Sequence, residues 1–317
     1  MGLMKHPGAG IWLDLGKGSC GTLALFLVYL SVPVAGLLPG IFVPLPAMFY
    51  AVKHGSKLGA GIVLISAAAL AVVVDPGSSL IYLFQDGLLS LLLPPLLGSG
   101  KGVSRALMLA VTATFVAILL AAIVYGVTTG IDLQTQLVKG IEKSVSQTIA
   151  LYQQSGVTGD DLATLRQAMQ QGGALIARIF PAMALVSLAG IAGLNVFAVN
   201  RLRTRLPNLP EFGDFRQFKN PDLLVWILIA AGFALLVPSE AVHRVALNIL
   251  VVTLFAYLLQ GMAIVQYLLG RFVVPAAMRF LLYFFLVLQP YLLIGVAVLG
   301  VFDLWGNFRT PRRPENL

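Results

Sequence analysis

Long apolar runs separated by short polar segments fill most of the chain. A helix needs about 20 apolar residues to cross the hydrocarbon core of a bilayer, and most of these runs approach that length. The pattern therefore predicts an all-α fold, a polytopic transmembrane helical bundle. The nine candidate runs are residues 21–38, 41–52, 58–74, 78–97, 106–127, 174–199, 223–237, 245–269 and 280–302.

Two of these runs are irregular. Residues 41–52 are short for an ordinary crossing and contain Pro44 and Pro46, so they form either a thin, irregular helix packed among its neighbours or a re-entrant segment. The last run contains Pro290, which kinks a helix. We therefore expect eight or nine spans.

The polar segment at residues 200–221 orients the bundle. Its basic side chains outnumber its acidic ones, and a short loop of this kind beside a span belongs in the cytoplasm. Counting crossings from this loop places residues 128–173 outside the cell. The same count puts the carboxy-terminal tail outside, although its arginines favour the cytoplasm, so the side of the tail stays open. The loop carries Arg201, Arg203, Arg205, Arg216 and Lys219 against Glu211 and Asp214, and the tail carries Arg309, Arg312 and Arg313.

The insertion at residues 130–172 predicts an extramembrane helical hairpin. Its first half repeats apolar residues at intervals of three to four, which is the spacing of one face of an amphipathic helix. A turn at Ser155 and Gly156 separates this helix from a second one with its own apolar face. The two faces comprise Leu137, Ile141, Val145, Ile149 and Tyr152, and then Leu162, Leu165 and Met169.

Composition agrees with a membrane protein. The chain is 58% hydrophobic and 11% charged, whereas an ordinary soluble domain has about 25% charged residues. The formal net charge is +8, but the basic residues form short clusters between apolar runs. Anionic lipid and the orientation rule explain such clusters better than nucleic acid does. Cys20 is the single cysteine, which excludes an intrachain disulfide.

Asp86, which follows Gln85 in the run 78–97, is the sharpest candidate for a ligand-binding role. A carboxylate near mid-bilayer is costly, so it marks a site for a proton, a cation or a polar ligand. Alternatively, a kink brings Asp86 to an aqueous edge. Arg178, near the outer end of its run, pairs with Asp86 or Asp75, or extends to the lipid headgroups.

A polar stripe follows the run 245–269. Its members, Thr253, Tyr257, Gln260 and Tyr267, fall on one narrow face of a helix with about 3.6 residues per turn. Such a stripe faces protein or a cavity rather than lipid. It provides hydrogen bonds between packed helices, or it lines a ligand site in which Tyr257 and Gln260 are the candidates.

Enzyme motifs are absent from the sequence. His6, His54 and His243 lie in the amino-terminal tail or in turns, and none has the spacing of a metal ligand pair. There is no HExxH motif, no Walker loop and no nucleophile elbow. We therefore expect no catalytic residue, no metal site and no cofactor.

The carboxy-terminal half resembles the YybS-like family of uncharacterised bacterial membrane proteins, a domain of unknown function (DUF2232). The resemblance extends over most of the chain and implies a multi-pass protein of the bacterial inner (cytoplasmic) membrane. It assigns no binding or catalytic residue. The residues that carry it are Leu247-Asn248, Gln260-Gly261-Met262-Ala263, Val274-Pro275 with Arg279, Tyr283-Phe284-Phe285, and the stretch GVFDLWGNFR at 300–309.

That family is similar in helix arrangement to the substrate-binding (S) components of energy-coupling-factor transporters, six-helix proteins that capture vitamins or metal ions. The likeness implies a six-helix, capture-like membrane core at residues 1–200, including the external insertion 130–172. The basic cytoplasmic loop 201–221, the membrane helices 222–302 and the polar tail 303–317 complete the division. Ala47 and Ala51 have the small-residue spacing with which such components meet a membrane partner.

Two functions fit these features. The first is capture or transport of a small solute at a site near Asp86 that the hairpin roofs. The second is a non-enzymatic membrane scaffold that recruits a cytoplasmic or envelope protein through the basic loop or the hairpin. The expected partners are the lipid bilayer and either a small-molecule ligand or another protein, and not nucleic acid.

Overall fold

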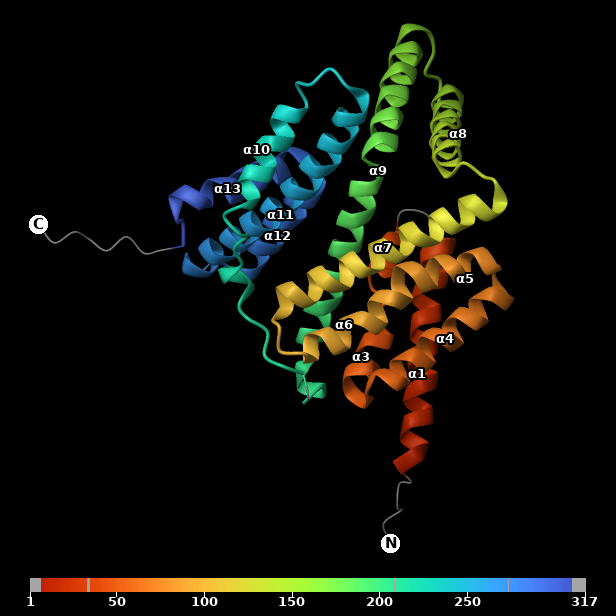
Figure 1. Ribbon diagram of the computed structural model, residues 1–317, viewed down its shortest axis with the longest axis vertical. Coiled ribbons are helices and arrows are strands. Elements are labelled where there is room, and N and C mark those ends of the chain that lie inside the picture. The colour runs from red at the N-terminus through yellow and green to blue at the C-terminus, as the bar shows by residue number, and fades with distance from the viewer. Residues whose placement is uncertain (1–6, 33–34, 208, 273, 310–317) are drawn as a thin grey trace, which may run out of the picture. The chain divides into compact units, whose positions relative to one another are not determined.

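The computed structural model describes residues 7–32, 35–207, 209–272 and 274–309, and within these ranges the chain is helical with no β-strand (Figure 1). The all-α prediction is confirmed. Seven of the described helices are long and apolar enough to cross a membrane, or eight if one bent pair counts as a single crossing. A count of eight spans agrees with the lower of the two predicted numbers, eight or nine.

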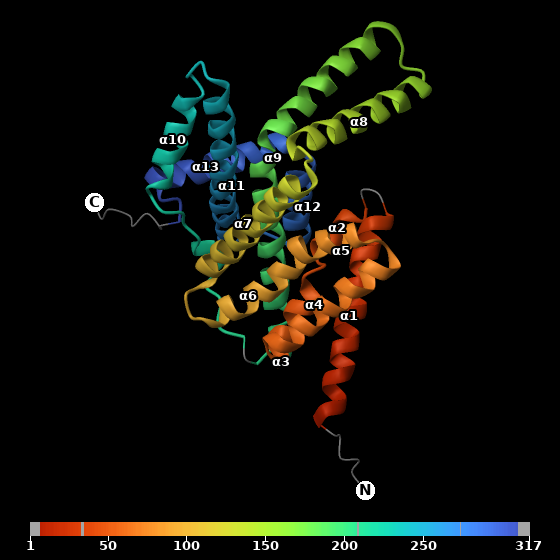
Figure 2. The same ribbon diagram turned by 45° about the vertical axis from the view of Figure 1, so that its right-hand side comes forward.

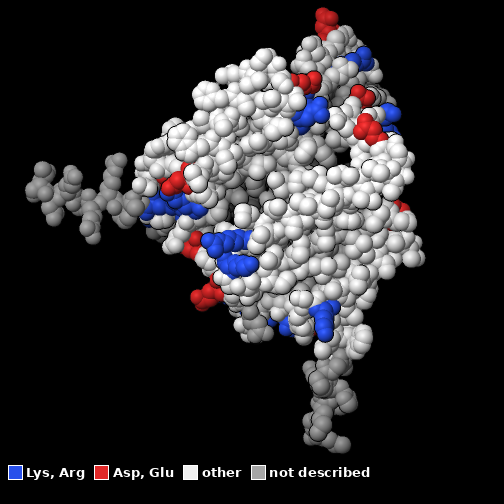
Figure 3. Space-filling model, viewed as in Figure 1, with Lys and Arg blue, Asp and Glu red and all other residues white. Residues whose placement is uncertain are grey.

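Apolar side chains cover much of the surface. On the face shown in Figure 3, charged side chains are sparse and uncharged residues dominate. Leu120, Ile123 and Val127 are among the large apolar residues that the structure leaves exposed on one helix. A lipid-facing surface accounts for this exposure, because lipid tails replace the protein neighbours that a soluble fold would need.

The described chain forms two compact units. The first comprises Met1–Leu133 and Ser187–Phe212, and the second comprises Gln134–Val186 and Gly213–Leu317. Most of the insertion, which the sequence analysis assigns to the amino-terminal core, therefore belongs to the second unit.

In the first unit, α1, α3, α4 and α5 surround a continuous apolar core, and α1, α3 and α4 lie side by side in Figures 1 and 2. The unit's own helices are α1 (Pro7–Ser31), α2 (Leu37–Ile41), α3 (Leu45–His54), α4 (Ser56–Val73), α5 (Pro76–Tyr82), the π-helical turn η1 (Leu83–Gly87), α6 (Leu88–Gly98) and α7 (Val103–Thr129). The core consists of Phe26, Val43, Ala47, Ile62, Val63, Ala67, Leu70 and Tyr82.

The first helix starts and ends earlier than predicted. We expected residues 21–38, but α1 spans Pro7–Ser31. Asp14 permits the early start, because its carboxylate is 2.6 Å from Lys53 Nζ and 2.7 Å from His54 Nε2 at the end of α3. The early end agrees with the preference of a residue before proline for extended backbone. Pro33 itself lies outside the described residues.

The short run 41–52 belongs to a longer broken helix. Together α2 and α3 form a candidate span of 18 residues, Leu37–His54. Between them, the N–H groups of Phe42, Val43 and Leu45 donate to carbonyl groups three residues earlier, which keeps the backbone paired around Pro44. The segment is therefore irregular, as expected, but longer than the apolar run alone indicated.

Ala47 and Ala51 pack inside the first unit. Both are buried on α3, and a Cβ added to Gly59 of α4 would lie 2.6 Å from the Ala51 Cβ. Their small size brings α3 and α4 close together. The suggestion that they meet a membrane partner is wrong, because α4 already covers them.

The second unit contains the hairpin and the carboxy-terminal helices. Its elements are α8 (Leu133–Gln154), the first part of α9 (Gly159–Arg201), η3 (Phe215–Gln217), α10 (Leu224–Ala234), α11 (Glu240–Arg271), α12 (Ala276–Leu288) and α13 (Pro290–Gly306), while η2 (Arg203–Arg205) follows α9 in the first unit.

Helices α8 and α9 pack against each other at the insertion. A Cβ added to Gly173 of α9 would be 3.0 Å from Ile141 and 3.5 Å from Val145, so the absent side chain admits the apolar face of α8. Tyr152, predicted on that face, is instead exposed. Helix α9 continues for 43 residues and joins the second helix of the insertion to the run 174–199 without a break. The position of the hairpin relative to the membrane remains a prediction.

The carboxy-terminal helices differ from the predicted spans. Helix α10 has 11 residues and is shorter than a full crossing. The run 280–302 is not one kinked helix, since α12 and α13 meet at Pro290 with a bend of 103°. A proline removes a backbone donor and clashes with the preceding turn, which explains a break at this position.

The beginning of the tail is attached to the loop. The Arg309 guanidinium donates to the carbonyl oxygens of Arg216 (3.0 Å) and Phe218 (2.8 Å), and it pairs with the buried carboxylate of Asp303. Residues 303–309 therefore lie beside the loop that the sequence places in the cytoplasm. Arg312 and Arg313 lie outside the described residues.

Candidate functional site

Asp86 lies in the interior of the first unit. It occupies the π-helical turn η1, its side chain is 1% exposed, and its Oδ1 atom has no hydrogen-bond partner among the described residues. Its carbonyl oxygen accepts a bond from Ser90 Oγ at 2.7 Å. Gln85 is half-buried beside it. The hypothesis of an exposed aqueous edge does not fit this burial.

The polar stripe of α11 joins elements of the second unit. Gln260 Nε2 donates to Asp303 Oδ2 at 2.9 Å, and Gln260 Oε1 accepts the backbone N–H of Asn220 at 3.0 Å. Thr253 bonds within its own helix, and Tyr257 is fully buried. Of the two alternatives for this stripe, the contacts of Gln260 fit helix packing.

Arg178 lies on α9 in the second unit. Its guanidinium forms an ion pair with Glu240 at the start of α11, with 3.4 Å between Nη2 and Oε1. The two side chains are 51% and 71% exposed, so the pair is weak. Its partner is thus Glu240, whereas the sequence offered Asp86, Asp75 or the lipid headgroups.

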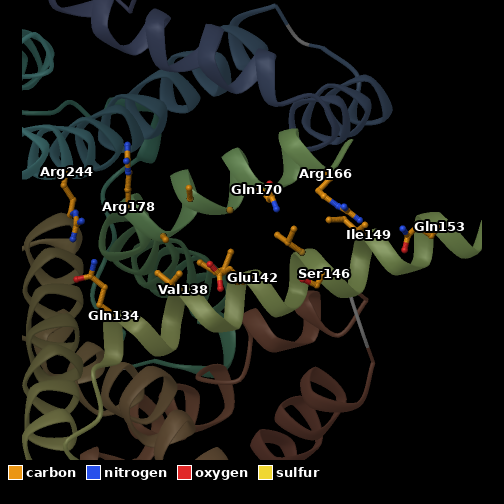
Figure 4. Close-up of a pocket in the computed structure, with 15 residues that line it drawn as sticks. Gln134, Val138, Glu142, Ser146, Ile149, Gln153, Arg166, Gln170, Arg178 and Arg244 are labelled. Carbon is orange, nitrogen blue, oxygen red and sulfur yellow. The ribbon is translucent and has the colours of Figure 1, made fainter. Parts of the chain in front are cut away.

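Arg178 also lines a cavity of about 700 Å³ that lies within the second unit. Figure 4 shows side chains of α8 and α9 in the space between the helices, with Arg178 and Arg244 toward one end and Arg166 toward the other. The lining comprises Gln134, Val138, Ile141, Glu142, Val145, Ser146, Ile149, Gln153, Arg166, Gln170, Gly173, Ala174, Ala177, Arg178 and Arg244.

The cavity combines an apolar wall with an excess of positive charge. Three arginines and one glutamate are in its lining, and Glu240 outside the lining pairs with Arg178, which leaves an excess of one positive charge. Val138, Ile141 and Val145 provide apolar surface from α8. Such a lining is complementary to a small molecule that has both an apolar part and an anionic group.

Asn248 of α11 forms hydrogen bonds with the backbone of α9 next to Arg178, at the edge of the cavity. Pro181 lies inside the continuous helix α9 just beyond this residue, where a regular helix would join Ala182 N–H to the Arg178 carbonyl. The Asn248 amide bridges this pair, since Ala182 N–H donates to its Oδ1 and its Nδ2 donates to the Arg178 carbonyl, each at 2.8 Å. The bridge fixes the position from which the Arg178 side chain extends.

Sequence reasoning missed three charged residues of the cavity. Glu142 and Arg166 directly follow Ile141 and Leu165 of the predicted apolar faces, and charges flanking those faces are the signal that could have identified them. Arg244 had no such signal, because it comes from a helix distant in the sequence.

Comparison with known proteins identifies the family. A family model described as "Predicted membrane protein (DUF2232)" matches residues 21–304. The chain is 24% identical over 304 residues to "Uncharacterized protein YybS" of Bacillus subtilis, with 90% of this chain and 93% of that protein covered. No solved structure gives a significant match. The match over nearly the whole chain confirms the resemblance to the YybS-like family: this protein belongs to the DUF2232 family of predicted membrane proteins.

Proposed function

We propose that this membrane protein captures a small solute that carries a negative charge, and that the cavity between α8 and α9 is its binding site. The observation that carries the proposal is the cavity itself, a space of about 700 Å³ in which apolar side chains alternate with polar ones and three arginines. Small-molecule sites in proteins commonly have about 300–1,000 Å³ and a few polar groups in a mainly apolar wall.

The arginines suit recognition of a carboxylate or a phosphate. A guanidinium offers several N–H donors in a planar arrangement that matches the oxygens of such a group. Arg178 can exchange its exposed ion pair with Glu240 for a ligand anion at little cost, because solvent screens that pair. Arg244 lines the same cavity and supplies a second cation.

The predicted orientation of the chain in the membrane determines the side from which the ligand would bind. If residues 200–221 face the cytoplasm, the hairpin and its cavity lie on the outer side of a bacterial cytoplasmic membrane. The ligand would then enter from outside, which is the direction that the likeness to capture components of transporters, drawn from the sequence, implies. The proposed role is binding, with or without transport, rather than catalysis.

Native mass spectrometry of the full-length protein in mild detergent tests the proposal. We expect the wild type to retain a small-molecule adduct and the double variant Arg178→Gln/Arg244→Gln to lose it. Each charge-assisted hydrogen bond contributes about 1.5–3 kcal/mol, so the loss of two should raise the dissociation constant about 100-fold or more. The control is Lys139→Gln/Lys143→Gln, which removes the same charge from exposed positions of α8 outside the cavity lining.

The possible outcomes separate the alternatives. Equal loss of adduct in both double variants would mean that net charge, not the cavity, holds the ligand, and would refute the site. A phospholipid identified by fragmentation would make the cavity a lipid site and would refute solute capture. A stoichiometric protein that copurifies without any small molecule would favour the scaffold.

A further inference from the structure

Six buried oxygen atoms on α1, α4, α5, η1 and α7 of the first unit have no hydrogen-bond partner within the usual geometric limits among the described residues, although the Tyr82 and Ser66 hydroxyl groups lie close enough to interact with each other. A buried polar atom without a partner is uncommon and calls for an explanation, such as a bound ion. We name these atoms the oxygen cluster. They are the hydroxyl oxygens of Ser19, Thr22, Ser66, Tyr82 and Thr114, and Oδ1 of Asp86, and none of these residues is more than 5% exposed.

Contacts between α1 and α4 place two members of the cluster, Thr22 and Ser66, at the same level along these helices. Gly18 lies against Ile62, and a Cβ added to Gly61 would be 3.1 Å from Leu15. The two helices therefore run parallel, and residues about 44 positions apart in the sequence lie side by side. One helical turn beyond the first pair, the same offset aligns Thr22 with Ser66.

A third segment approaches α4 from the opposite direction. Ser79 Oγ donates to the Ala67 carbonyl at 2.7 Å, and a Cβ on Gly87 would be 3.0 Å from Val63, so α5 and η1 run antiparallel to α4. Tyr82 therefore lies at the level of Ser66. Asp86, next to Gly87, lies at the level of Val63.

The remaining members join the same region. Ser19 directly follows Gly18, and the offset between α1 and α4 brings it to the level of Val63 and hence of Asp86. Tyr82 contacts α1 through an edge-to-face pair with Phe26, whose ring centroid is 5.7 Å away. Thr114 belongs to α7, which packs against η1.

The oxygen cluster lies near the middle of its candidate spans. Ser19 and Thr22 are central in Gly10–Ser31, Ser66 in Ser56–Val73, and Asp86 in Pro76–Gly98. The last span contains the π-helical turn at Asp86, and such turns occur often at functional sites. Ion sites of membrane transport proteins commonly lie at the bilayer midplane.

We infer that the oxygen cluster binds a dehydrated monovalent alkali cation, with Asp86 as its charged ligand. Oxygen ligands suit a hard cation, and each hydroxyl has lone pairs to offer. One carboxylate neutralises one positive charge, whereas a divalent ion would leave a net charge in a medium of low dielectric constant. The inference is independent of the hairpin cavity and its ligand.

Thermal unfolding of the full-length protein in detergent tests this site. We expect the Tm to rise by several degrees, with saturation, when Na⁺ or K⁺ replaces choline at constant chloride concentration and ionic strength, because an ion that binds only the folded state stabilises it. Asp86→Asn should abolish the rise. Asp75→Asn is the control, because it removes a carboxylate from an exposed turn and should leave the rise intact.

A second variant covers the case in which Asp86→Asn fails to fold. Thr22→Val removes one neutral ligand and keeps the shape, so we expect it to raise the half-saturating cation concentration several-fold. Identical Tm values in Na⁺, K⁺ and choline would overturn the inference. So would a Tm that responds to pH alone, which would make Asp86 a proton site, or a full cation effect in Asp86→Asn.

Discussion

Single glycines determine how closely α11 and α13 approach each other. A Cβ on Gly261 would overlap the carbonyl oxygen of Val296, and one on Gly300 would overlap the carbonyl oxygen of Tyr257. Without side chains at these two positions, backbone meets backbone, which is how small residues promote helix association in membranes. The same approach brings Gln260 within hydrogen-bond distance of Asp303.

We therefore expect Gly261→Ala to destabilise the second unit by about 1–3 kcal/mol, the usual cost of overpacking. Thermal unfolding in detergent measures the effect as a lower Tm. Gly295→Ala on α13 is the matched control, because nothing lies within 4 Å of a Cβ added there. Equal Tm values for the two variants would contradict the close approach of these helices.

At the same scale, the sequence identified Asp86 but not its surroundings. A carboxylate inside an apolar run is visible without a structure, because the cost of its burial is a property of the residue. Ser19 and Ser66 are unremarkable in sequence, since small hydroxyl residues are common where membrane helices pack. Only the offsets between α1, α4 and η1 bring them to the level of Asp86.

Among the elements, α9 combines two roles in one helix. Its first part packs against α8 at the cavity, and its second part belongs to the first unit. Pro181 lies in the first part, and Asn248 of α11 bridges the Arg178 carbonyl and the Ala182 N–H beside the proline. In the sequence, Asn248 stands out only as part of the family resemblance, because a role between two helices leaves no local pattern.

This arrangement makes the effects of Asn248 and Pro181 interdependent. Asn248→Leu should lower stability by roughly 1–3 kcal/mol, because two backbone groups lose their partner. In a Pro181→Ala background the helix can close its own hydrogen bond, so the same change should cost much less. A double-mutant cycle of Tm values measures the coupling, and additive effects would show that the amide does not replace the helical bond.

For the whole molecule, the contacts of the basic loop bear on topology. Arg309 bonds the loop at Arg216 and Phe218, and Gly270 near the end of α11 lies beside the Arg216 guanidinium. The chain between α11 and the tail thus begins and ends next to the same loop. The bend of 103° between α12 and α13 fits a segment that enters and returns on one side. The tail arginines would then lie with the loop, as the positive-inside rule favours.

Cysteine labelling tests this topology. With Cys20 replaced by serine, we expect Ser155→Cys in the hairpin turn to react with a membrane-impermeant maleimide on intact spheroplasts. Gly213→Cys in the loop, and a cysteine appended after Leu317, should react only after the membrane is opened. Labelling of Gly213→Cys on intact spheroplasts, with Ser155→Cys protected, would reverse the orientation and place the cavity in the cytoplasm.

The sequence by itself determined the class of protein and most of the helices, including the two at the insertion, because apolar length and helical periodicity are local properties of the chain. It also identified Asp86 and Arg178 as residues whose charge is unusual for their position. Only the tertiary structure decided that α9 is continuous, that α12 and α13 bend sharply, and that Ala47 and Ala51 pack inward. It alone brought Arg244 to Arg178 and the scattered hydroxyls to the level of Asp86. These features depend on which helix faces meet, and the packing of residues distant in the sequence decides that.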